Sequence, residues 1–223
     1  MNRTLFMQAV VKFVLGVLLT ALLIFLPAGT FEFAKGWLFL AVLFVPMLIV
    51  GIILMVKSPE LLRKRLQSKE KAREQDLVVK LSAMMFLLGF VSAGLNFRFG
   101  WYVLPEWVSM SASVCFLAGY LLYARVMKEN AFLSRVIEVQ ENQRVVDTGL
   151  YAIVRHPMYS ATLLLFLSMP LILGSLISFV IFLVYPVLIA KRIIHEEAFL
   201  EENLEGYRAY KQKVRYRLIP YIW

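Results

Sequence analysis

Long blocks of apolar residues alternate with short blocks of charged residues along this chain, and the pattern predicts membrane-spanning helices. A helix rises about 1.5 Å per residue, so about 20 apolar residues cross a hydrocarbon core of about 30 Å. Four segments are apolar and long enough for this, at roughly Leu5–Leu26, Trp37–Val56, Leu77–Phe97 and Pro105–Ala124. We therefore expect residues 1–127 to form four N-terminal transmembrane helices, the first of them a retained anchor.

An uncharged stretch over residues 160–190 predicts a helical hairpin. As one helix its 31 residues would be about 46 Å long, which overshoots the hydrocarbon core. Pro170 and Gly174 interrupt its middle, and proline removes one backbone hydrogen bond from a helix. We expect two helices, at roughly 160–173 and 175–190, that fold back and bring the polar residues at both ends to one membrane face.

Composition places the chain among polytopic membrane proteins. Hydrophobic residues make up 61% of the chain and the mean hydropathy is +0.73, whereas soluble domains are about half apolar. We expect an all-α integral membrane protein with a single domain, residues 1–223, in which four spanning helices and the hairpin give five to six hydrophobic segments. The single cysteine, Cys115, excludes an intrachain disulfide and a cysteine-cluster metal site.

Lysine and arginine concentrate in three segments, 57–80, 125–155 and 191–217. Basic loops face the cytoplasm by the positive-inside rule, so both termini and the polar motifs are expected on the cytoplasmic side. The net charge of +9 then reflects orientation and contact with anionic lipid headgroups. We expect no nucleic acid partner, because the basic residues flank membrane segments.

The first polar motif stands where a loop becomes the first helix of the hairpin. Arg155 and His156 precede Pro157, a residue suited to a first helical position, and Tyr159 follows. The opening turn of a helix offers unpaired N–H groups and the positive end of its dipole. Together with the side-chain donors this suits a carboxylate or a phosphate. A basic residue and a tyrosine that anchor a helix at the interface are the plainer alternative.

The second polar motif leaves the other leg of the hairpin. Arg192 and Glu196 are four residues apart and share a helix face, while Glu197 points about 100° away. Two adjacent carboxylates near a membrane are costly unless they are paired or functional, and they could hold an ammonium group. Apolar residues beyond them, with Tyr207, predict a cytoplasmic amphipathic C-terminal helix on the membrane or over the site. Ordinary charge pairs on an interfacial helix are the alternative.

Together the motifs resemble the isoprenylcysteine carboxyl methyltransferase family, whose wider group includes bacterial relatives and phospholipid methyltransferases. The resemblance covers roughly the C-terminal 95 residues and is carried by Val146–Tyr151, Arg155–Tyr159, Glu196–Glu197, Tyr207-x-x-Tyr210 and Arg217-x-x-Pro220, with Asn130, Phe132 and Ser134 near its start. The chain departs from the family pattern at Ala161, where Gly is usual, and at Glu205–Gly206, where related chains have a Phe-Gly pair further upstream.

The resemblance implies that residues 128–223 bind S-adenosylmethionine on the cytoplasmic side and that a lipophilic acceptor arrives from the bilayer. It assigns the cofactor contacts to Tyr151, Arg155, His156, Tyr159, Glu196, Glu197 and Tyr207. The arginine, histidine and motif tyrosine would serve the cofactor carboxylate, a glutamate the ammonium group, and one of the other two tyrosines the adenine ring.

Methyl transfer sets the expected catalytic residues, Arg192, Glu196 and Glu197. A carboxylate acceptor is ionised at neutral pH and needs no base, and Arg192 could orient it. An amine, phenol or thiol would need deprotonation, for which His195 or a glutamate is the candidate.

Carboxyl O-methylation of an isoprenylcysteine-like or other lipid acceptor is the expected reaction. Phospholipid N-methylation, an NADPH-dependent membrane reductase and a non-catalytic scaffold or transporter remain alternatives. A metal site is not expected, because the chain has only two histidines and no ligand pair has the helical spacing of zinc sites.

Overall fold

The computed structural model describes residues 3–66, 73–133 and 139–223, and over these ranges the protein is helical and forms no strand. Four long helices correspond to the predicted spans: α1 (Arg3–Ala28), α2 (Ala34–Lys57), α4 (Arg73–Phe99) and α5 (Glu106–Glu129). Each is long and apolar enough to cross a membrane, as is a fifth segment, Leu176–Asn203. The expected all-α integral membrane fold is confirmed.

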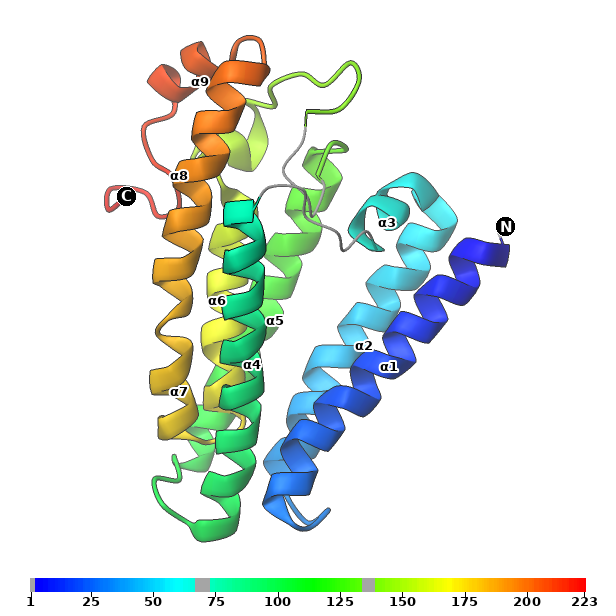
Figure 1. Ribbon diagram of the computed structural model, residues 1–223, viewed down its shortest axis with the longest axis vertical. Helices are drawn as coiled ribbons and strands as arrows, with labels where there is room; N and C mark the ends of the chain where they lie inside the picture. The colour runs from blue at the N-terminus through cyan, green and yellow to red at the C-terminus, as the bar shows by residue number, and fades with distance from the viewer. Residues whose placement is uncertain (1–2, 67–72, 134–138) are drawn as a thin grey trace.

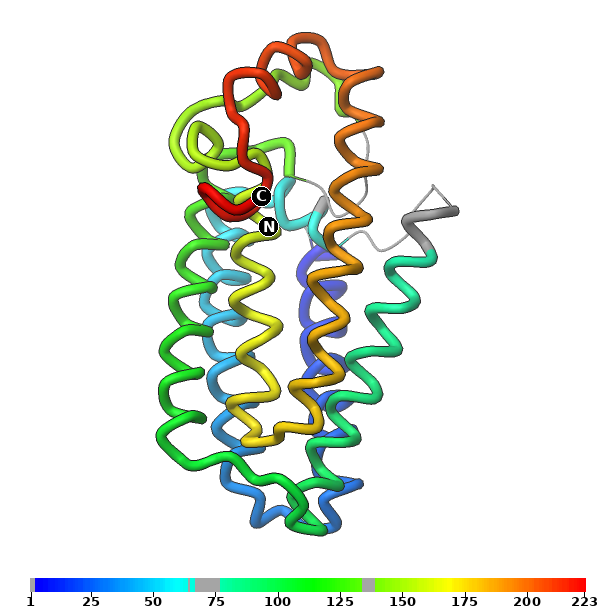
Figure 2. Tube along the Cα trace, turned by 90° about the vertical axis from the view of Figure 1, so that its left-hand side faces the viewer, coloured from blue at the N-terminus to red at the C-terminus, as the bar shows by residue number. Residues whose placement is uncertain are grey.

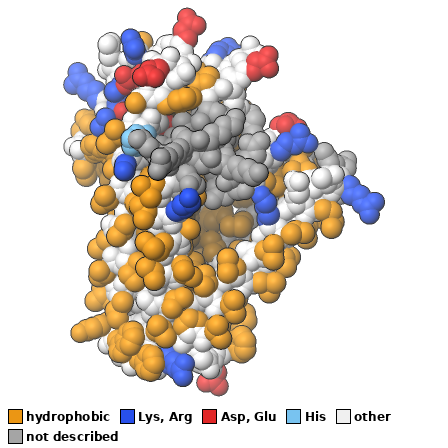
Figure 3. Space-filling model, viewed as in Figure 1, with side chains coloured by type: hydrophobic (Ala, Val, Ile, Leu, Met, Phe, Trp, Pro, Cys, Tyr) orange, Lys and Arg blue, Asp and Glu red, His pale blue; other side chains and the backbone are white. Residues whose placement is uncertain are grey.

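The long helices form a bundle with its charged side chains gathered toward one end. Figure 1 shows α1 and α2 side by side on one flank and α4 to α8 on the other. Hydrophobic side chains cover the middle and lower parts of the face drawn in Figure 3, and most charged ones lie at its upper end. Many large apolar side chains on the helices are exposed, among them Leu15, Leu18, Ile52, Leu121 and Val187. Such a surface suits the hydrocarbon of a bilayer.

The predicted hairpin is present, and its turn lies at Gly174. The first leg, α6 (Pro157–Ile172), continues through Pro170 and ends two residues later. Gly174 has φ +70°, a conformation that L side chains rarely adopt. Its carbonyl accepts a 2.8 Å hydrogen bond from the N–H of Leu104, which ties the turn to the loop before α5.

The second leg of the hairpin differs from the single helix expected over 175–190. It consists of α7 (Leu176–Phe182) and α8 (Tyr185–Asn203). Pro186 stands in the first turn of α8, and its missing N–H interrupts the hydrogen-bond ladder there. Helix α8 then continues well beyond the apolar stretch 160–190. It therefore places both glutamates of the second motif outside the apolar part of the bundle.

Close packing of α4 against its neighbours depends on two glycines. A Cβ atom on Gly89 would lie 2.2 Å from the Phe182 ring of α7, and one on Gly94 would lie 2.4 Å from the Ile24 carbonyl of α1. Small residues allow this approach between membrane helices. The rings of Phe86 and Phe90 on α4 pack around Phe182 at centroid distances of 5.3 and 6.0 Å. Helix α4 and the hairpin therefore share one core.

A short helix follows the second span. It is α3 (Pro59–Leu66), with Pro59 as its first residue. Glu74 belongs to the next helix, α4, and residues 67–72 lie outside the described ranges. Arg65 of α3 lies over the Tyr123 ring, 5.1 Å from its centroid, and its Nη2 is 3.4 Å from Met158 Sδ. These contacts join α3 to the start of α6.

The C-terminal segment returns to the first polar motif. After α8, Gly206 adopts φ +82° and opens α9 (Tyr207–Lys213), which corresponds to the expected C-terminal helix in a shorter form. Residues 214–223, which we call the tail, then run beside the start of α6 (Figure 2). The N–H groups of Arg155 and His156 each donate a 2.9 Å hydrogen bond to tail carbonyls.

Candidate functional site

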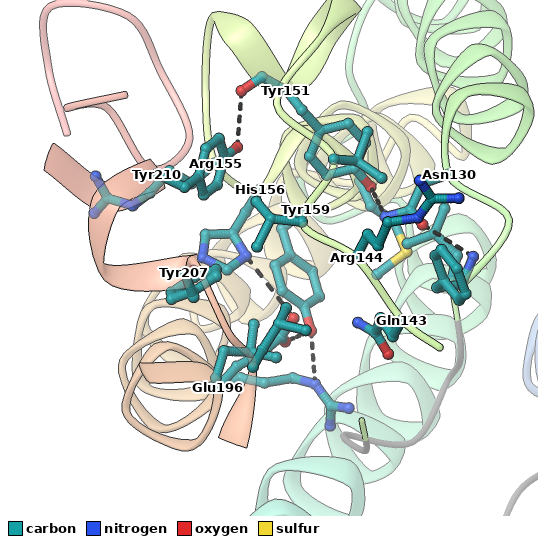
Figure 4. A pocket seen from close by; sticks show the side chains of 18 residues that line it. Asn130, Gln143, Arg144, Tyr151, Arg155, His156, Tyr159, Glu196, Tyr207 and Tyr210 are labelled. Atoms are coloured by element: carbon teal, nitrogen blue, oxygen red, sulfur yellow. Dashed lines mark hydrogen bonds and ion pairs between the residues drawn. The ribbon is translucent and has the colours of Figure 1, made fainter. Parts of the chain in front are cut away.

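A pocket lies at the charged end of the bundle, where α6 begins and α8 ends (Figure 4). Its walls come from α6, α8, α9, the single-turn helix η1 (Gly149–Ala152), and the segment between α5 and η1. Of the residues predicted from the sequence, the lining includes Tyr151, Arg155, His156, Tyr159, Arg192, Glu196 and Tyr207. The hairpin therefore brings both polar motifs to one place.

Local sequence explains how the first motif reaches the pocket. His156 has a non-helical backbone, φ −125°, and Pro157 begins α6 directly after it. The ring of Pro157 disfavours the helical region at the preceding residue, and its absent N–H would have no helical partner in the first turn. Glu129, at the end of α5, accepts a 2.8 Å hydrogen bond from the N–H of Leu150 and so fixes η1 upstream.

Glu197 lies behind the pocket wall at the centre of a buried charge cluster. Its side chain is 2% exposed, and it does not belong to the described lining. Oε1 accepts from Arg155 Nε at 2.7 Å and lies 3.1 Å from His156 Nε2, and Oε2 accepts from Arg217 Nε at 3.0 Å. Lys211 Nζ is 3.8 Å away. Buried charges need such partners, and the carboxylate holds the motif, α8 and the tail together.

The guanidinium of Arg155 is occupied by protein groups. Besides its bond to Glu197, Nη1 donates to the carbonyls of Val214 at 2.7 Å and Arg215 at 2.8 Å. Arg155 thus lines the pocket while its guanidinium N–H groups hydrogen-bond to carbonyls of the tail. Its predicted contact with a cofactor carboxylate stays a prediction, and in this arrangement the side chain orients its neighbours.

Glu196 faces the pocket and is oriented by two side chains. Tyr159 Oη donates to Glu196 Oε2 at 2.5 Å, and Arg192 Nε donates to Tyr159 Oη at 3.0 Å (Figure 4). The Glu196 side chain is 21% exposed, and His156 Nδ1 lies 3.9 Å from its Oε1. The chain of donors runs from a cation through a phenol to a carboxylate, so it fixes the orientation of the Glu196 side chain at the pocket.

Two tyrosines on the opposite side are linked through the backbone. Tyr210 Oη donates to the Tyr151 carbonyl at 2.7 Å, and Asn130 Nδ2 donates to Tyr151 Oη at 3.1 Å. Asn130 Oδ1 accepts from the N–H of Phe132 at 2.9 Å, which fixes the amide orientation. Asn130 and Phe132, quoted for the family resemblance, thus line the pocket; Ser134 lies outside the described ranges.

Tyr207 differs from these tyrosines because its hydroxyl lacks a partner. The side chain is 4% exposed, and within residues 3–66, 73–133 and 139–223 its Oη is a buried polar atom without a hydrogen bond. Burial, and then the charge of Glu197, raise the pKa of Tyr207, so the phenol keeps its proton at neutral pH. A buried donor without an acceptor is costly, which points to a ligand group that is absent from the protein itself.

The sequence reasoning missed Gln143 and Arg144, which also line the pocket. They lie on the segment between α5 and η1, where no site residue was predicted from the sequence. Neither residue has a helical spacing or a motif that could have identified it, because folding of an irregular segment brings it to the pocket. His195, the candidate base, is half-buried and is not in the lining that the described residues form.

Comparisons with known proteins agree with the resemblance seen in the motifs. The model of the family described as phospholipid methyltransferase matches residues 107–206, which include both polar motifs. The protein-S-isoprenylcysteine O-methyltransferase of Schizosaccharomyces pombe (strain 972 / ATCC 24843) is 30% identical over 131 residues, 57% of this chain and 53% of that protein. The chain thus spans about half the length of this curated relative. The predicted resemblance to these membrane methyltransferases is confirmed, and the family model covers all of the described pocket lining except Tyr207 and Tyr210.

Proposed function

We propose that this integral membrane protein transfers a methyl group from S-adenosylmethionine to a lipophilic acceptor at the pocket between α6 and α8. The observation that carries the proposal is the pocket-facing carboxylate of Glu196, which Tyr159 and Arg192 orient. It lies in the region that matches the methyltransferase family model. Six of the seven residues that the family resemblance assigns to the cofactor line this pocket, and the seventh, Glu197, lies behind its wall.

The residues present fit the chemistry of this cofactor. S-adenosylmethionine supplies a methyl group already activated on a sulfonium, next to an ammonium, a carboxylate and an adenine ring. Glu196 would pair with the ammonium group, and the unpaired hydroxyl of Tyr207 would donate to a polar group of the cofactor. The rings of Tyr151 and Tyr207 would pack on the adenine. The ion pair between Arg155 and Glu197 would hold the pocket wall in position.

Alignment of the acceptor with the methyl group is then the main task of the protein. Holding two reactants in a reactive geometry can contribute roughly 7–11 kcal/mol to lowering a barrier. Apolar wall residues such as Leu200 and Met158 would exclude water from the reacting atoms. An acceptor carboxylate is ionised at neutral pH and needs no base, and Arg192 would orient it. Carboxyl O-methylation of an isoprenylcysteine-like or other lipid acid is therefore the proposed reaction.

Phospholipid N-methylation is the second candidate, because the matching family model carries that description. An amine acceptor must lose a proton, for which Glu196 or His156 would serve as base. The two reactions leave products with different stability in alkali. A methyl ester releases its methyl group as methanol, whereas a methylated amine keeps it. Labelled methyl transfer into membrane lipids and prenylated peptides, followed by alkaline treatment, distinguishes them.

The placement of the site supports a division of labour along the chain. The described residues that line the pocket lie between Asn130 and Tyr210, within the proposed cofactor region 128–223. Residues 1–127 would provide the membrane scaffold and the path of the lipid. Because basic residues concentrate at this end, the site and both termini would face the cytoplasm.

The first test is calorimetric titration of the purified protein in detergent with S-adenosylmethionine, S-adenosylhomocysteine and NADPH. Wild-type protein is expected to bind both adenosyl compounds, and Glu196→Gln to lose them. Glu202→Gln is the matched control, because Glu202 is an exposed residue of the same helix that does not line the pocket. Binding of NADPH alone would favour a reductase, and unchanged affinity in Glu196→Gln would remove the proposed site.

A further inference from the structure

Arg144 is a pocket-lining arginine that the described part of the chain leaves without a counter-ion. It lies on the segment before η1, and its side chain is exposed to the pocket mouth. Over the described ranges it forms no hydrogen bond or ion pair. Figure 4 shows it beside Asn130, on the side of the pocket away from Tyr207. The pocket thus has an unpaired cation on one side and an unpaired buried hydroxyl on the other.

The other arginines near the pocket are already engaged. Arg155 and Arg217 both donate to Glu197, and Arg155 also holds tail carbonyls. Arg192 donates to the Tyr159 hydroxyl. Recruiting Arg155 or Arg217 for an anionic ligand would weaken contacts that shape the wall and would uncover the buried carboxylate of Glu197. Arg144 can bind an anion without such a loss.

We propose that Arg144 binds the carboxylate of S-adenosylmethionine, an inference that rests on the proposed function. The amino-acid end of the cofactor is a zwitterion, so its site needs a positive and a negative group. Glu196 supplies the negative group on the wall of α8, and Arg144 supplies the positive one on the segment facing it. A guanidinium matches a carboxylate with two parallel hydrogen bonds, which makes the pairing geometric as well as electrostatic.

The unpaired hydroxyl of Tyr207 supports a polar ligand over an alkyl chain in this pocket. A lipid tail would leave both Tyr207 Oη and the Arg144 guanidinium without partners. The carboxylate that Arg144 recognises could still belong to the acceptor lipid instead of the cofactor. The two sources differ in which affinity depends on Arg144, so the experiment measures both.

The experiment compares S-adenosylmethionine with its decarboxylated analogue, which keeps the sulfonium, the amine and the adenosine. Binding of each is titrated to wild-type protein, Arg144→Gln, Arg144→Lys and Arg208→Gln in lipid nanodiscs, and the KM for a prenylated peptide as acceptor is measured for the same proteins. Arg208 is the matched control because it is an exposed arginine of α9 that does not line the pocket. A charge-assisted contact of this kind should change the dissociation constant by about tenfold or more.

We expect Arg144→Gln to bind S-adenosylmethionine about tenfold more weakly while its affinity for the decarboxylated analogue stays unchanged. Arg144→Lys should lie between Arg144→Gln and wild type, because lysine keeps the charge and loses the paired hydrogen bonds. Equal affinities of wild type and Arg144→Gln for S-adenosylmethionine would overturn the inference. So would a raised KM for the acceptor alone, which would place the acceptor's carboxylate there. If wild-type protein binds neither compound, the proposed function itself fails.

Discussion

The two neighbouring glutamates of α8, Glu196 and Glu197, should respond differently to substitution by glutamine: one variant should lose stability and the other should lose cofactor binding. Glu197 is 2% exposed and contacts Arg155, His156 and Arg217 at 2.7–3.1 Å. Removing one partner of a buried ion pair costs about 3–5 kcal/mol, because the remaining charges stay buried without compensation. Glutamine keeps the shape and some hydrogen bonds, so we expect Glu197→Gln to lower the free energy of unfolding by about 3 kcal/mol. Glu196→Gln should cost about 1 kcal/mol, because this side chain is partly exposed.

Thermal unfolding in detergent, followed by tryptophan fluorescence, measures the difference. For a chain of this size 1 kcal/mol corresponds to about 2–4 °C, so Glu197→Gln should lower Tm by roughly 6–12 °C. Amide hydrogen exchange should also quicken at Arg155 and His156, whose N–H groups donate to the tail. Glu196→Gln should melt within a few degrees of wild type and lose binding of S-adenosylmethionine.

The reverse result would refute this division of roles. If Glu197→Gln melts like wild type and still loses the cofactor, Glu197 contacts ligand and the buried cluster does not hold the wall. If Glu196→Gln melts far below wild type with its cofactor affinity intact, Glu196 is the structural residue of the two.

Three further variants test other contacts of the site. Gly149→Ala should lower Tm more than Gly100→Ala: both glycines have positive φ, but a Cβ on Gly149 would lie 2.5 Å from Glu129 Oε2, whereas Gly100 faces open space; equal losses would show that backbone strain alone matters. Tyr159→Phe should weaken S-adenosylmethionine binding about tenfold in calorimetry, since Glu196 loses its orienting donor; unchanged affinity would count against that role. Burial raises the pKa of Tyr207 above its usual 10.0, so the contribution of the protonated phenol to stability is complete below pH 10 and declines at higher pH. The Tm of wild type should therefore fall more steeply above pH 10 than the Tm of Tyr207→Phe. Parallel curves of Tm against pH would argue against a raised pKa of Tyr207.

Hydrophobic patterning predicted most of the architecture because bilayer thickness constrains helix length. The four N-terminal spans agree with the predicted segments to within a few residues, and Gly174 marks the turn of the hairpin. The break between α7 and α8 was missed, although Pro186 was a visible signal for it.

Most residues of the site were predictable from the sequence, whereas the orientation of their side chains was less so. Helical spacing separates Glu196 from Glu197 by about 100°, but it does not say which of them faces the pocket. That choice depends on the tail, whose carbonyls and Arg217 surround Arg155 and Glu197 from far along the chain. Arg144 reaches the pocket through an irregular segment, where sequence periodicity carries no information.

The two adjacent glutamates of α8 also limit how this protein can evolve. Inserting or deleting one residue between Tyr185 and Glu196 would turn the end of the helix by about 100° relative to its start. The residue that faces the pocket and the residue that anchors the buried cluster would then both be misdirected in a single event. The apolar side chains of this part of α8, such as Leu188 and Ile189, can therefore be exchanged for other apolar types, whereas the number of residues between Tyr185 and Glu196 is fixed. Length variation among homologues should be confined to the connections outside it, such as the segment between α3 and α4.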